Sequence, residues 1–238
     1  MLTVFLENNQ GLLWFLTVLL DLSFAITMYR MFGRYGLYGI IIFSLMMANI
    51  QGPKLTVIFG FQTSMGVILY SSIFFATDLL SEKYGRAEAQ RAVMMGFITN
   101  IMLVVFSQMS LLYIPSTASE TAEYASSVHN ALVTVFSYTP RFVFGSLMAY
   151  LLSQSFDVWI YHLIKEATHG KYLWLRNTGS TLLSQAVDTL IYGLVVWWGI
   201  VELQTALQLA GAKYIFKFLI AILDTPFIYA ARSWKQGN

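Results

Sequence analysis

A nine-residue polar pattern occurs twice in this sequence, as Ser-Gln-x-x-Asp-x-x-Ile-Tyr at residues 153–161 and 184–192. The second copy lies within a long apolar run from Leu182 to Ile200. A carboxylate at the centre of such a run costs roughly 2.5–3.5 kcal/mol to insert into a membrane. One face of a helix through this run carries four polar side chains, Thr181, Ser184, Gln185 and Asp188. This polar stripe should therefore face protein or a water-filled cavity and not lipid.

We interpret the polar stripe as part of a site for a polar solute. The alternative is structural, since polar side chains also join membrane helices through hydrogen bonds. The first copy of the pattern adds Gln154 and Asp157 to the candidate site. If the two copies lie on successive antiparallel helices, they can form a pseudo-symmetric pair that faces one cavity. A chance resemblance between the copies is the alternative.

The composition is that of a membrane protein. Of the 238 residues, 57% are hydrophobic and 11% are charged, and the mean hydropathy is +0.63. A soluble domain carries about 25% charged residues, so this chain lacks the polar surface that water requires. Repeated apolar runs of about 20 residues indicate several membrane-spanning helices. The chain contains no cysteine and no basic block with interleaved aromatics, so thiolate chemistry and nucleic-acid binding are not indicated.

The expected fold class is an all-α, polytopic transmembrane helical bundle in a single domain, residues 1–238. Seven spans are predicted, at residues 12–31, 36–51, 57–79, 91–113, 131–157, 177–200 and 213–231. Six spans remain possible if the first two runs form one re-entrant unit. Glu7 precedes the first run where a signal peptide would carry basic residues, so this run is interpreted as a span. Pro140 and Pro226 are expected to bend the fifth and seventh spans.

The basic residues predict the orientation, because they concentrate on the cytoplasmic side of membrane proteins. Alternate connections place ten of them on one side: Arg30, Arg34, Lys83, Arg86, Arg91, Lys165, Lys171, Arg176, Arg232 and Lys235. The other side receives only Lys54 and Lys213. The amino terminus is therefore predicted outside and the carboxyl terminus in the cytoplasm.

Several charged side chains fall inside the predicted spans. At a rise of about 1.5 Å per residue, four lie near the bilayer midplane, namely Asp21, Arg141, Asp188 and Asp224. Lys217 lies nearer the outside, and Asp78 and Asp157 lie nearer the inside. Isolated charges are untenable in lipid, so these groups should converge on one interior. Arg141 can hold one of the three midplane carboxylates, which leaves the others for solute or protons. A folding network of buried ion pairs is the alternative.

Uncharged polar residues complete the candidate site. Tyr138 shares a helix face with Thr134 and Arg141. Asn100 lies mid-depth in the fourth span, where its amide can both donate and accept, and Asn49 lies at the outer mouth.

The link after the third span forms a second motif, in which Asp78 and Glu82 lie one helical turn apart and Tyr84-Gly85 follows. Gly85 is expected to end the helix. We interpret the motif as a cytoplasmic gate in which Lys83 and Arg86 pair with the acidic residues. A capped helix end with a solvated charge cluster is the alternative.

Enzyme chemistry is weakly supported. The three histidines never adopt the spacing of a zinc site, so no metal or cofactor is expected. Asp188-Thr189 and Asp224-Thr225 resemble the two Asp-Thr pairs of an aspartyl protease, but the Gly-x-Gly-Asp motif of intramembrane aspartyl proteases is absent.

Three sequence blocks carry a resemblance to a known family. They are Asp78-Leu-Leu-Ser-Glu-Lys-Tyr-Gly85, the block Trp174-Leu-Arg-Asn177 with Ser180-Thr-x-x-Ser-Gln-x-x-Asp-Thr189, and Asp224-Thr-Pro-x-x-Tyr229. With the flanking residues from Ala48 and around Ser153, they span nearly the whole chain. In these blocks the chain resembles the queuosine precursor transporters, also called the vitamin-uptake transporter family. The resemblance adds Arg176 and Asn177 to the cytoplasmic motif.

The resemblance implies uptake of deazaguanine nucleobases, the cyano and aminomethyl precursors of queuosine, across the bacterial inner membrane without a known ATPase partner. It also implies a fold similar to the substrate-binding subunits of energy-coupling-factor vitamin transporters. One carboxylate can accept the ring N–H and the exocyclic amine of such a base, and Asp188 is the first candidate for this role and Asp224 the second. Gln185, Asn49 and Asn100 are candidates for the remaining polar groups, and Tyr138 or Phe142 for stacking on the ring.

Other interpretations stay open. The chain can be the membrane subunit of an ATP-driven vitamin importer, or an intramembrane hydrolase that uses Asp188 and Asp224. Proton-coupled transport and facilitated diffusion are both compatible with these residues. Gly33, Gly36 and Gly39 permit close helix packing, and a homodimer is possible.

Overall fold

The computed structural model describes residues 2–137, 140–197, 199 and 202–234. The regular elements of this part are helices, apart from one β-hairpin. In chain order they are α1 (Leu2–Glu7), α2 (Gln10–Phe32), α3 (Arg34–Gln51), β1 (Leu55–Ile58), β2 (Phe61–Ser64), the 3-10 turn η1 (Met65–Val67), α4 (Tyr70–Lys83), α5 (Arg86–Leu111), α6 (Ala122–Phe136), α7 (Pro140–Ala167), α8 (Leu173–Tyr192), the π-helical turn η2 (Gly193–Trp197) and α9 (Leu203–Ser233). The prediction of a helical bundle is confirmed.

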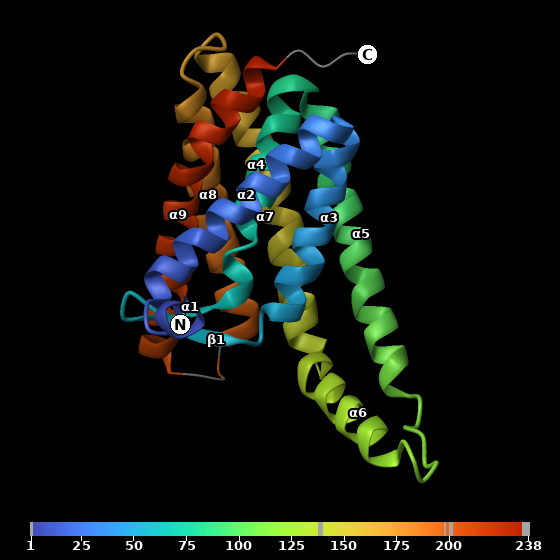
Figure 1. Ribbon diagram of the computed structural model, residues 1–238. Coiled ribbons are helices and arrows are strands. Elements are labelled where there is room, and N and C mark those ends of the chain that lie inside the picture. The colour runs from blue at the N-terminus through green and yellow to red at the C-terminus, as the bar shows by residue number, and fades with distance from the viewer. Residues whose placement is uncertain (1, 138–139, 198, 200–201, 235–238) are drawn as a thin grey trace.

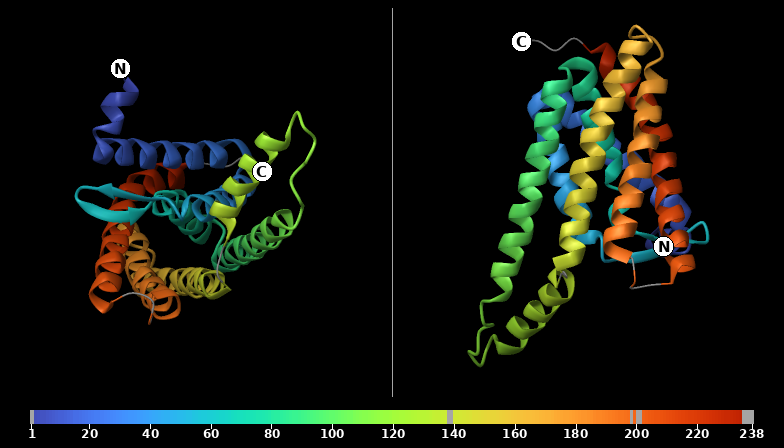
Figure 2. Two further views of the ribbon diagram at one scale, coloured as in Figure 1. Left: turned by 90° about the horizontal axis from the view of Figure 1, so that it is seen from below. Right: turned by 180° about the vertical axis from the view of Figure 1, so that it is seen from behind.

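The long helices stand side by side in one bundle with two different ends (Figures 1 and 2). The α2–α3, α4–α5 and α7–α8 connections and the end of α9 gather at one end. We call it the basic end, because its connections and helix termini carry Arg30, Arg34, Lys83, Arg86, Lys165, Lys171 and Arg232. The N-terminus, the β-hairpin and α6 lie at the opposite end, which we call the hairpin end (Figure 1).

Part of the third predicted span, residues 57–79, is not helical. Its first residues belong to the β-hairpin, in which Ile58 pairs with Phe61 across a two-residue turn. The turn residues Phe59 and Gly60 have φ angles of 51° and 81°. Two-residue hairpin turns of the type that matches strand twist require positive φ at both positions, which glycine adopts readily. The β-branched residues before the turn favour a strand, and hydropathy alone did not separate this strand from a span.

The fifth predicted span, residues 131–157, consists of two helices. α6 ends at Phe136 and α7 begins at Pro140. Proline is favoured in the first turn of a helix, where its missing N–H is not needed. The predicted bend at Pro140 is therefore wrong, because this residue begins a helix. α6 has no buried residue and projects beyond the bundle (Figure 1). Pro226 does lie inside α9.

Five helices of the described part are long and apolar enough to cross a membrane, at Gln10–Phe32, Met65–Lys83, Arg86–Leu111, Phe142–Ala167 and Leu203–Ser233. The predicted multi-pass character is confirmed. α3 and α8 run through the same bundle, but their polar residues lower their hydropathy (Figure 1). In α8 those residues include the predicted polar stripe, which is buried in the bundle. The count of seven spans stays a prediction.

α4 is the central element of the bundle. Every residue from Ser71 to Ser81 is buried, and α2, α3, α5, α7 and α9 all contact this helix. A helix that is buried on all sides can carry polar groups only where neighbouring helices provide partners. Asp21 on α2 does so near the start of α4, where it accepts hydrogen bonds from the Ser71 hydroxyl and, at 2.9 Å, from the Ser72 backbone N–H. The neighbours of α4 therefore determine where its polar side chains can act.

Two glycines of α3 allow α2 and α3 to pack closely. A Cβ atom at Gly36 would lie 2.0 Å from the backbone oxygen of Met28, whereas one at Gly39 would lie 3.4 Å from the flexible end of the Met28 side chain. Both glycines thus face another helix of the same chain. The predicted homodimer remains untested.

We predict that Gly36→Ala destabilises the protein by about 1–3 kcal/mol, because overpacking against backbone forces the helices apart. Gly39→Ala is the matched control, since its methyl group meets only a flexible side chain. Thermal unfolding of both variants in detergent measures the difference. Equal melting temperatures for the two variants would contradict the close α2–α3 contact.

Candidate functional site

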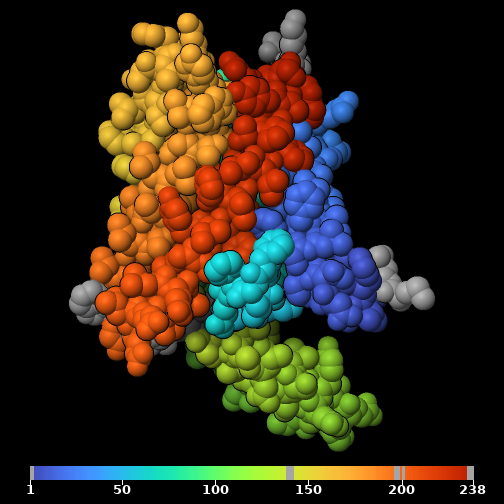
Figure 3. Space-filling model, turned by 90° about the vertical axis from the view of Figure 1, so that its left-hand side faces the viewer, coloured from blue at the N-terminus to red at the C-terminus, as the bar shows by residue number. Residues whose placement is uncertain are grey.

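A cavity of about 430 Å³ lies at the hairpin end, between the β-hairpin and the ends of several helices. Figure 3 shows the hairpin packed between α9 and α2 on one face of the molecule. The cavity wall combines aromatic and polar side chains. The aromatic residues are Tyr70, Phe142 and Tyr192, and the polar ones are Asn49, Gln62, Thr63, Ser64, Thr134, Ser137, Ser146, Thr189 and Lys213. The volume falls within the range of roughly 300–1,000 Å³ that is usual for small-molecule sites.

Asp188 lies directly behind this wall, adjacent in sequence to Thr189, and is almost fully buried. Its Oδ2 atom accepts from Lys217 Nζ at 2.8 Å and lies 3.8 Å from Lys213 Nζ. The side chain of Lys217 is completely buried, whereas that of Lys213 is 21% exposed and lines the cavity. The carboxylate is therefore held by one lysine from inside the protein and by a second, more distant lysine at the cavity surface.

Aromatic rings stabilise both lysines. The Lys217 ammonium lies 4.3 Å from the centre of the Tyr70 ring, and that of Lys213 lies 4.0 Å from the centre of the Tyr192 ring. Such cation–π contacts are strengthened when water is excluded. Lys217 also donates to Gln185 Oε1. The second copy of the polar pattern thus forms one network with α9. The polar stripe therefore joins α8 to α9, as the structural alternative expected.

A second group of carboxyls lies deeper in the bundle. Asp157 Oδ1 accepts from the Ser184 hydroxyl at 2.9 Å, and Asp157 also lies within hydrogen-bonding reach of Asp78. Asp224 Oδ1 accepts from Asn177 Nδ2 at 2.8 Å. All three carboxyls are buried, and they come from α7, α4 and α9. The two copies of the polar pattern therefore have different surroundings. Asp157 lies near other carboxyls, whereas Asp188 is paired with lysines.

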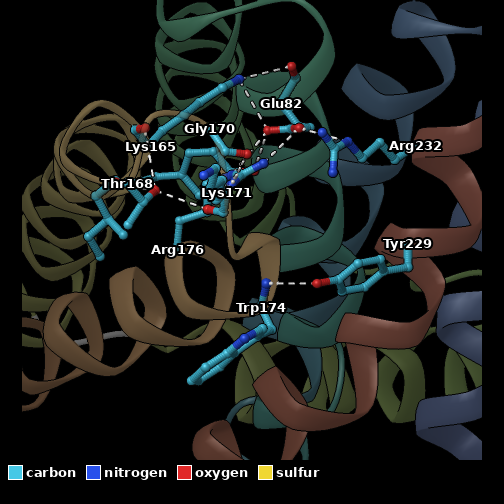
Figure 4. A network of polar contacts seen from close by, with 11 residues as sticks. Glu82, Lys165, Thr168, Gly170, Lys171, Trp174, Arg176, Tyr229 and Arg232 are labelled. Atoms are coloured by element: carbon cyan, nitrogen blue, oxygen red, sulfur yellow. Dashed lines mark hydrogen bonds and ion pairs between the residues drawn. The ribbon is translucent and has the colours of Figure 1, made fainter.

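A cluster of ions around Glu82 lies at the basic end (Figure 4). Arg176 donates from Nη2 to Glu82 Oε1 at 2.8 Å and from Nε to Oε2 at 3.2 Å. Lys165 Nζ lies 3.1 Å and Arg232 Nε 3.0 Å from the same carboxylate, and the Tyr161 hydroxyl donates to it at 3.1 Å. We call these five residues the Glu82 cluster. It joins α4, α7, α8 and α9.

The prediction that Lys83 and Arg86 pair with the acidic residues of the cytoplasmic motif is wrong. Lys83 donates to the backbone oxygen of Trp234 and lies over the Tyr29 ring, and no contact of the Arg86 side chain with Glu82 is found in the described part. The Glu82 side chain is only 6% exposed and that of Arg176 is fully buried, so the cluster is not a solvated helix end. Gly85 does end α4, with a φ angle of 87° and its N–H donating to Leu80.

The remaining predicted residues lie in different places. Asn49 lines the cavity. Asn100 and Gln154 are buried away from its wall, and Tyr84 packs beside Tyr29 near the basic end. Asn177 contacts Asp224 and does not belong to the Glu82 cluster. Tyr138 and the Arg141 side chain lie outside the described residues.

Several residues of these groups were not predicted. Tyr70, Tyr192 and Lys213 line the cavity, and Lys165, Tyr161 and Arg232 belong to the Glu82 cluster. The sequence could have indicated Lys213, since only this lysine and Lys54 fall on the side of the membrane that is predicted to carry few basic residues. Arg232, Lys165 and Tyr161 lie far from Glu82 in sequence, and only helix packing brings them together.

Asp188 and Asp224 do not form the carboxyl pair of an aspartyl protease. Asp188 is paired with Lys217 and Asp224 with Asn177, so these two carboxyls do not share the proton that an aspartyl protease requires. Among the described residues, no group of three His, Cys, Asp or Glu side chains could hold a metal ion.

Comparisons with known proteins point to a membrane transporter. Residues 64–231 match a family described as "Putative vitamin uptake transporter". The chain is 36% identical over 226 residues to the "Probable queuosine precursor transporter" of Bacillus subtilis (strain 168), which covers 94% of this chain and 95% of that one. It is 29% identical over 169 residues to the "Queuosine precursor transporter" of Escherichia coli (strain K12), covering 70% and 71% of the two chains. No solved structure gives a significant match.

We predict that Glu82→Gln opens the basic end. Removing this charge leaves Arg176 buried without its partner, and breaking a buried ion pair in this way costs about 3–5 kcal/mol. The chain has no cysteine, so a single Ser81→Cys substitution reports on this site. A thiol reagent should label it faster when Glu82→Gln is also present.

Glu88→Gln is the control, because Glu88 pairs with the exposed Arg91 and exposed ion pairs contribute little. Equal labelling rates with and without Glu82→Gln would show that the cluster does not close this end.

Proposed function

Because the chain belongs to the vitamin uptake transporter family of membrane transporters, we propose that it carries queuosine precursors, deazaguanine nucleobases, into the cell. Two relatives named as queuosine precursor transporters support this substrate, one of them aligned over nearly the full length of both chains. The observation that carries the proposal is a ligand-sized cavity at one end of the bundle, with the Asp188–Lys217 pair behind its wall and the Glu82 cluster closing the other end.

The cavity wall suits a flat, polar bicyclic ring. Tyr70, Phe142 and Tyr192 provide faces on which a nucleobase can stack. Asn49 and Gln62 provide amides that can donate to the ring carbonyl and accept from exocyclic amines. The chemistry of the wall is thus the mixture of apolar faces and a few orienting polar groups that small-molecule sites use.

Asp188 remains the proposed recognition carboxylate. Its weaker partner, Lys213, is partly exposed and 3.8 Å away, so this lysine can move when a base enters. The ring N–H and exocyclic amine of a deazaguanine would then donate to the carboxylate as a bidentate pair. Adenine presents an acceptor where guanine presents this ring N–H. An adenine would therefore leave buried polar groups unpaired and be rejected.

We propose that the basic end faces the cytoplasm and that α3 and α8 also cross the bilayer, which gives seven spans with the N-terminus outside. The concentration of basic side chains at one end of the bundle supports this orientation. In this orientation the cavity faces the outside and the Glu82 cluster closes the cytoplasmic side. The structure would then represent the outward-facing state of a carrier, and uptake would require the cluster to open after the base has bound.

Similarity of the fold to the substrate-binding subunits of energy-coupling-factor transporters stays part of this proposal. Such a subunit would transport only together with ATPase subunits. Purified protein in liposomes distinguishes the two modes, because a self-sufficient carrier moves labelled cyano-deazaguanine without ATP or any partner. Absence of transport without ATPase subunits, with the base still bound, would favour the importer subunit.

We predict that cyano- and aminomethyl-deazaguanine stabilise the detergent-solubilised protein against heat, whereas adenine does not. A ligand at a hundredfold its dissociation constant adds about 2.7 kcal/mol to the free energy of unfolding. A thermal-shift series with guanine, adenine and the two deazaguanines measures this effect. If none of the guanine-like bases raised the melting temperature, the proposed substrate class would be rejected.

We further predict that the double variant Asp188→Asn/Lys217→Met folds but binds the base roughly ten- to a hundredfold more weakly, since a hydrogen bond to a charged group contributes about 1.5–3 kcal/mol. The double variant avoids leaving Lys217 unpaired, which Asp188→Asn alone would do at a cost of about 3–5 kcal/mol. Equilibrium binding of labelled cyano-deazaguanine measures the change. Parental affinity in the double variant would exclude Asp188 as the recognition carboxylate.

A further inference from the structure

Two carboxyl groups meet in the centre of the bundle without a donor between them. Asp78 of α4 and Asp157 of α7 lie within hydrogen-bonding reach of each other, and their exposures are 0% and 1%. Neither oxygen of Asp78 has a hydrogen-bond partner in the described part of the chain, and the same holds for Oδ2 of Asp157. We call these two residues the carboxyl pair. Asp78 and Asp157 present acceptor oxygens to each other, and no donor from the described residues lies between them.

Among the described side chains, no free cation neutralises the carboxyl pair. In the described part of the chain, the charged and titratable groups that interact with it are Asp224 on α9, Arg176 on α8 and Tyr161 on α7, and the Ser180 and Ser184 hydroxyls of α8 lie within hydrogen-bonding reach of Asp157. Asp224 adds a third negative charge, and Arg176 is engaged by Glu82 at 2.8 Å. On the other neighbours of α4, Asp21 of α2 is bound to Ser71 and Ser72, and Glu88 of α5 is bound to Tyr38 of α3.

Uncharged polar groups next to the pair also lack partners. The Gln154 side chain, one helical turn from Asp157, is completely buried, and neither its amide nitrogen nor its oxygen makes a hydrogen bond among the described residues. The Thr181 hydroxyl is equally buried and unpaired, one turn from the Ser184 that donates to Asp157. Buried polar atoms are nearly always paired, so the carboxyl pair and its neighbours need partners that the described side chains do not supply.

Two contacting carboxyls in a dry interior cannot both carry a negative charge, and such pairs hold one proton between them. We propose that the carboxyl pair is the proton-binding site of this carrier and that proton entry drives uptake of the base. The inference rests on the proposed function, because base uptake is the work to which the proton is coupled. The proton comes from the outside water, binds between Asp78 and Asp157, and leaves to the cytoplasm.

The position of the pair connects it with the Glu82 cluster. Asp78 and Glu82 are one turn apart on α4, and Asp157 and Tyr161 are one turn apart on α7. While the proton is bound, the pair holds α4 and α7 together beneath the cluster. When it leaves, the two negative charges repel and push the same helices apart. A bound proton therefore keeps the basic end closed while the cavity is open to the outside, and loss of the proton to the cytoplasm favours the opening that completes uptake.

Infrared spectroscopy of the purified protein tests the site without any substrate. At neutral pH the unsubstituted protein should show the carbonyl stretch of a protonated carboxyl group, shifted in heavy water. Asp78→Asn and Asp157→Asn should each abolish this band. Asp21→Asn is the matched control, because Asp21 is also buried but receives two hydrogen bonds, and it should keep the band. Absence of the band in the unsubstituted protein would overturn the proposal.

Transport in liposomes tests the coupling. With acid outside, the unsubstituted protein should accumulate labelled cyano-deazaguanine several-fold above equilibrium, and an uncoupler should abolish the excess. Asp157→Asn should still exchange internal for external base but accumulate no excess, while Asp21→Asn should accumulate like the parent.

The outcomes separate this inference from the proposed function. Exchange of the base without a response to the pH gradient, or accumulation driven by sodium alone, overturns the proton site and leaves the function intact. Failure of the unsubstituted protein to bind or exchange the base overturns the proposed function, and the infrared band then decides the proton site by itself.

Discussion

A charge inside this bundle must be neutralised by another group of the chain or by a bound proton or ligand, because the hydrocarbon around it supplies neither water nor ions. α8 meets this requirement by polar contacts along its whole length. Near the basic end Arg176 binds Glu82 of α4, and near the hairpin end Asp188 binds Lys217 of α9. Between them, Ser184 donates to Asp157 of α7. A helix rich in buried polar side chains is thus the one that joins α4, α7 and α9.

The charges along this axis are not balanced evenly. At the hairpin end Asp188 has two lysines, and at the basic end Glu82 has three cations. In the middle, three carboxyls lie together, and Arg176, which interacts with Asp78 in the described part of the chain, is already bound to Glu82. Ion pairs at the two ends hold helices in fixed positions, whereas the group of carboxyls proposed to bind a proton would change its interactions when that proton arrives. A carrier needs both properties, since it must keep one end closed while the other opens.

The sequence predicted the features that depend on composition. The apolar runs indicated a helical bundle, and the cost of a carboxylate in lipid indicated that the stripe with Asp188 would be buried, as it is. The residues around Asp78 and Glu82 were recognised as a motif because of their charge. Partners were harder to predict, since Lys83 and Arg86 are near Glu82 in sequence but Arg176 and Arg232 reach it in space. Which helices become neighbours is decided by packing of the whole chain.

The hairpin shows a second limit of hydropathy. Its residues are as apolar as those of a span, and only the Phe59-Gly60 turn and the β-branched residues before it distinguish a strand. The consequence for the site is large, because Gln62, Thr63 and Ser64 then line the cavity. A helix in their place would have spread these side chains around its axis.

The central position of α4 explains how distant parts of the site can act together. This helix begins at Tyr70 in the cavity wall and carries Asp78 in the middle and Glu82 at the closed end. A hydrogen-bonded helix of this length moves as one body, since each turn is fixed to the next by backbone hydrogen bonds. In the proposed mechanism, a base that displaces Tyr70, or a proton that leaves Asp78, therefore acts on the same rigid element that Glu82 ties to three other helices. Because tightly packed interfaces shift between discrete arrangements and do not deform continuously, a small change at either position can decide whether the Glu82 cluster is formed or broken.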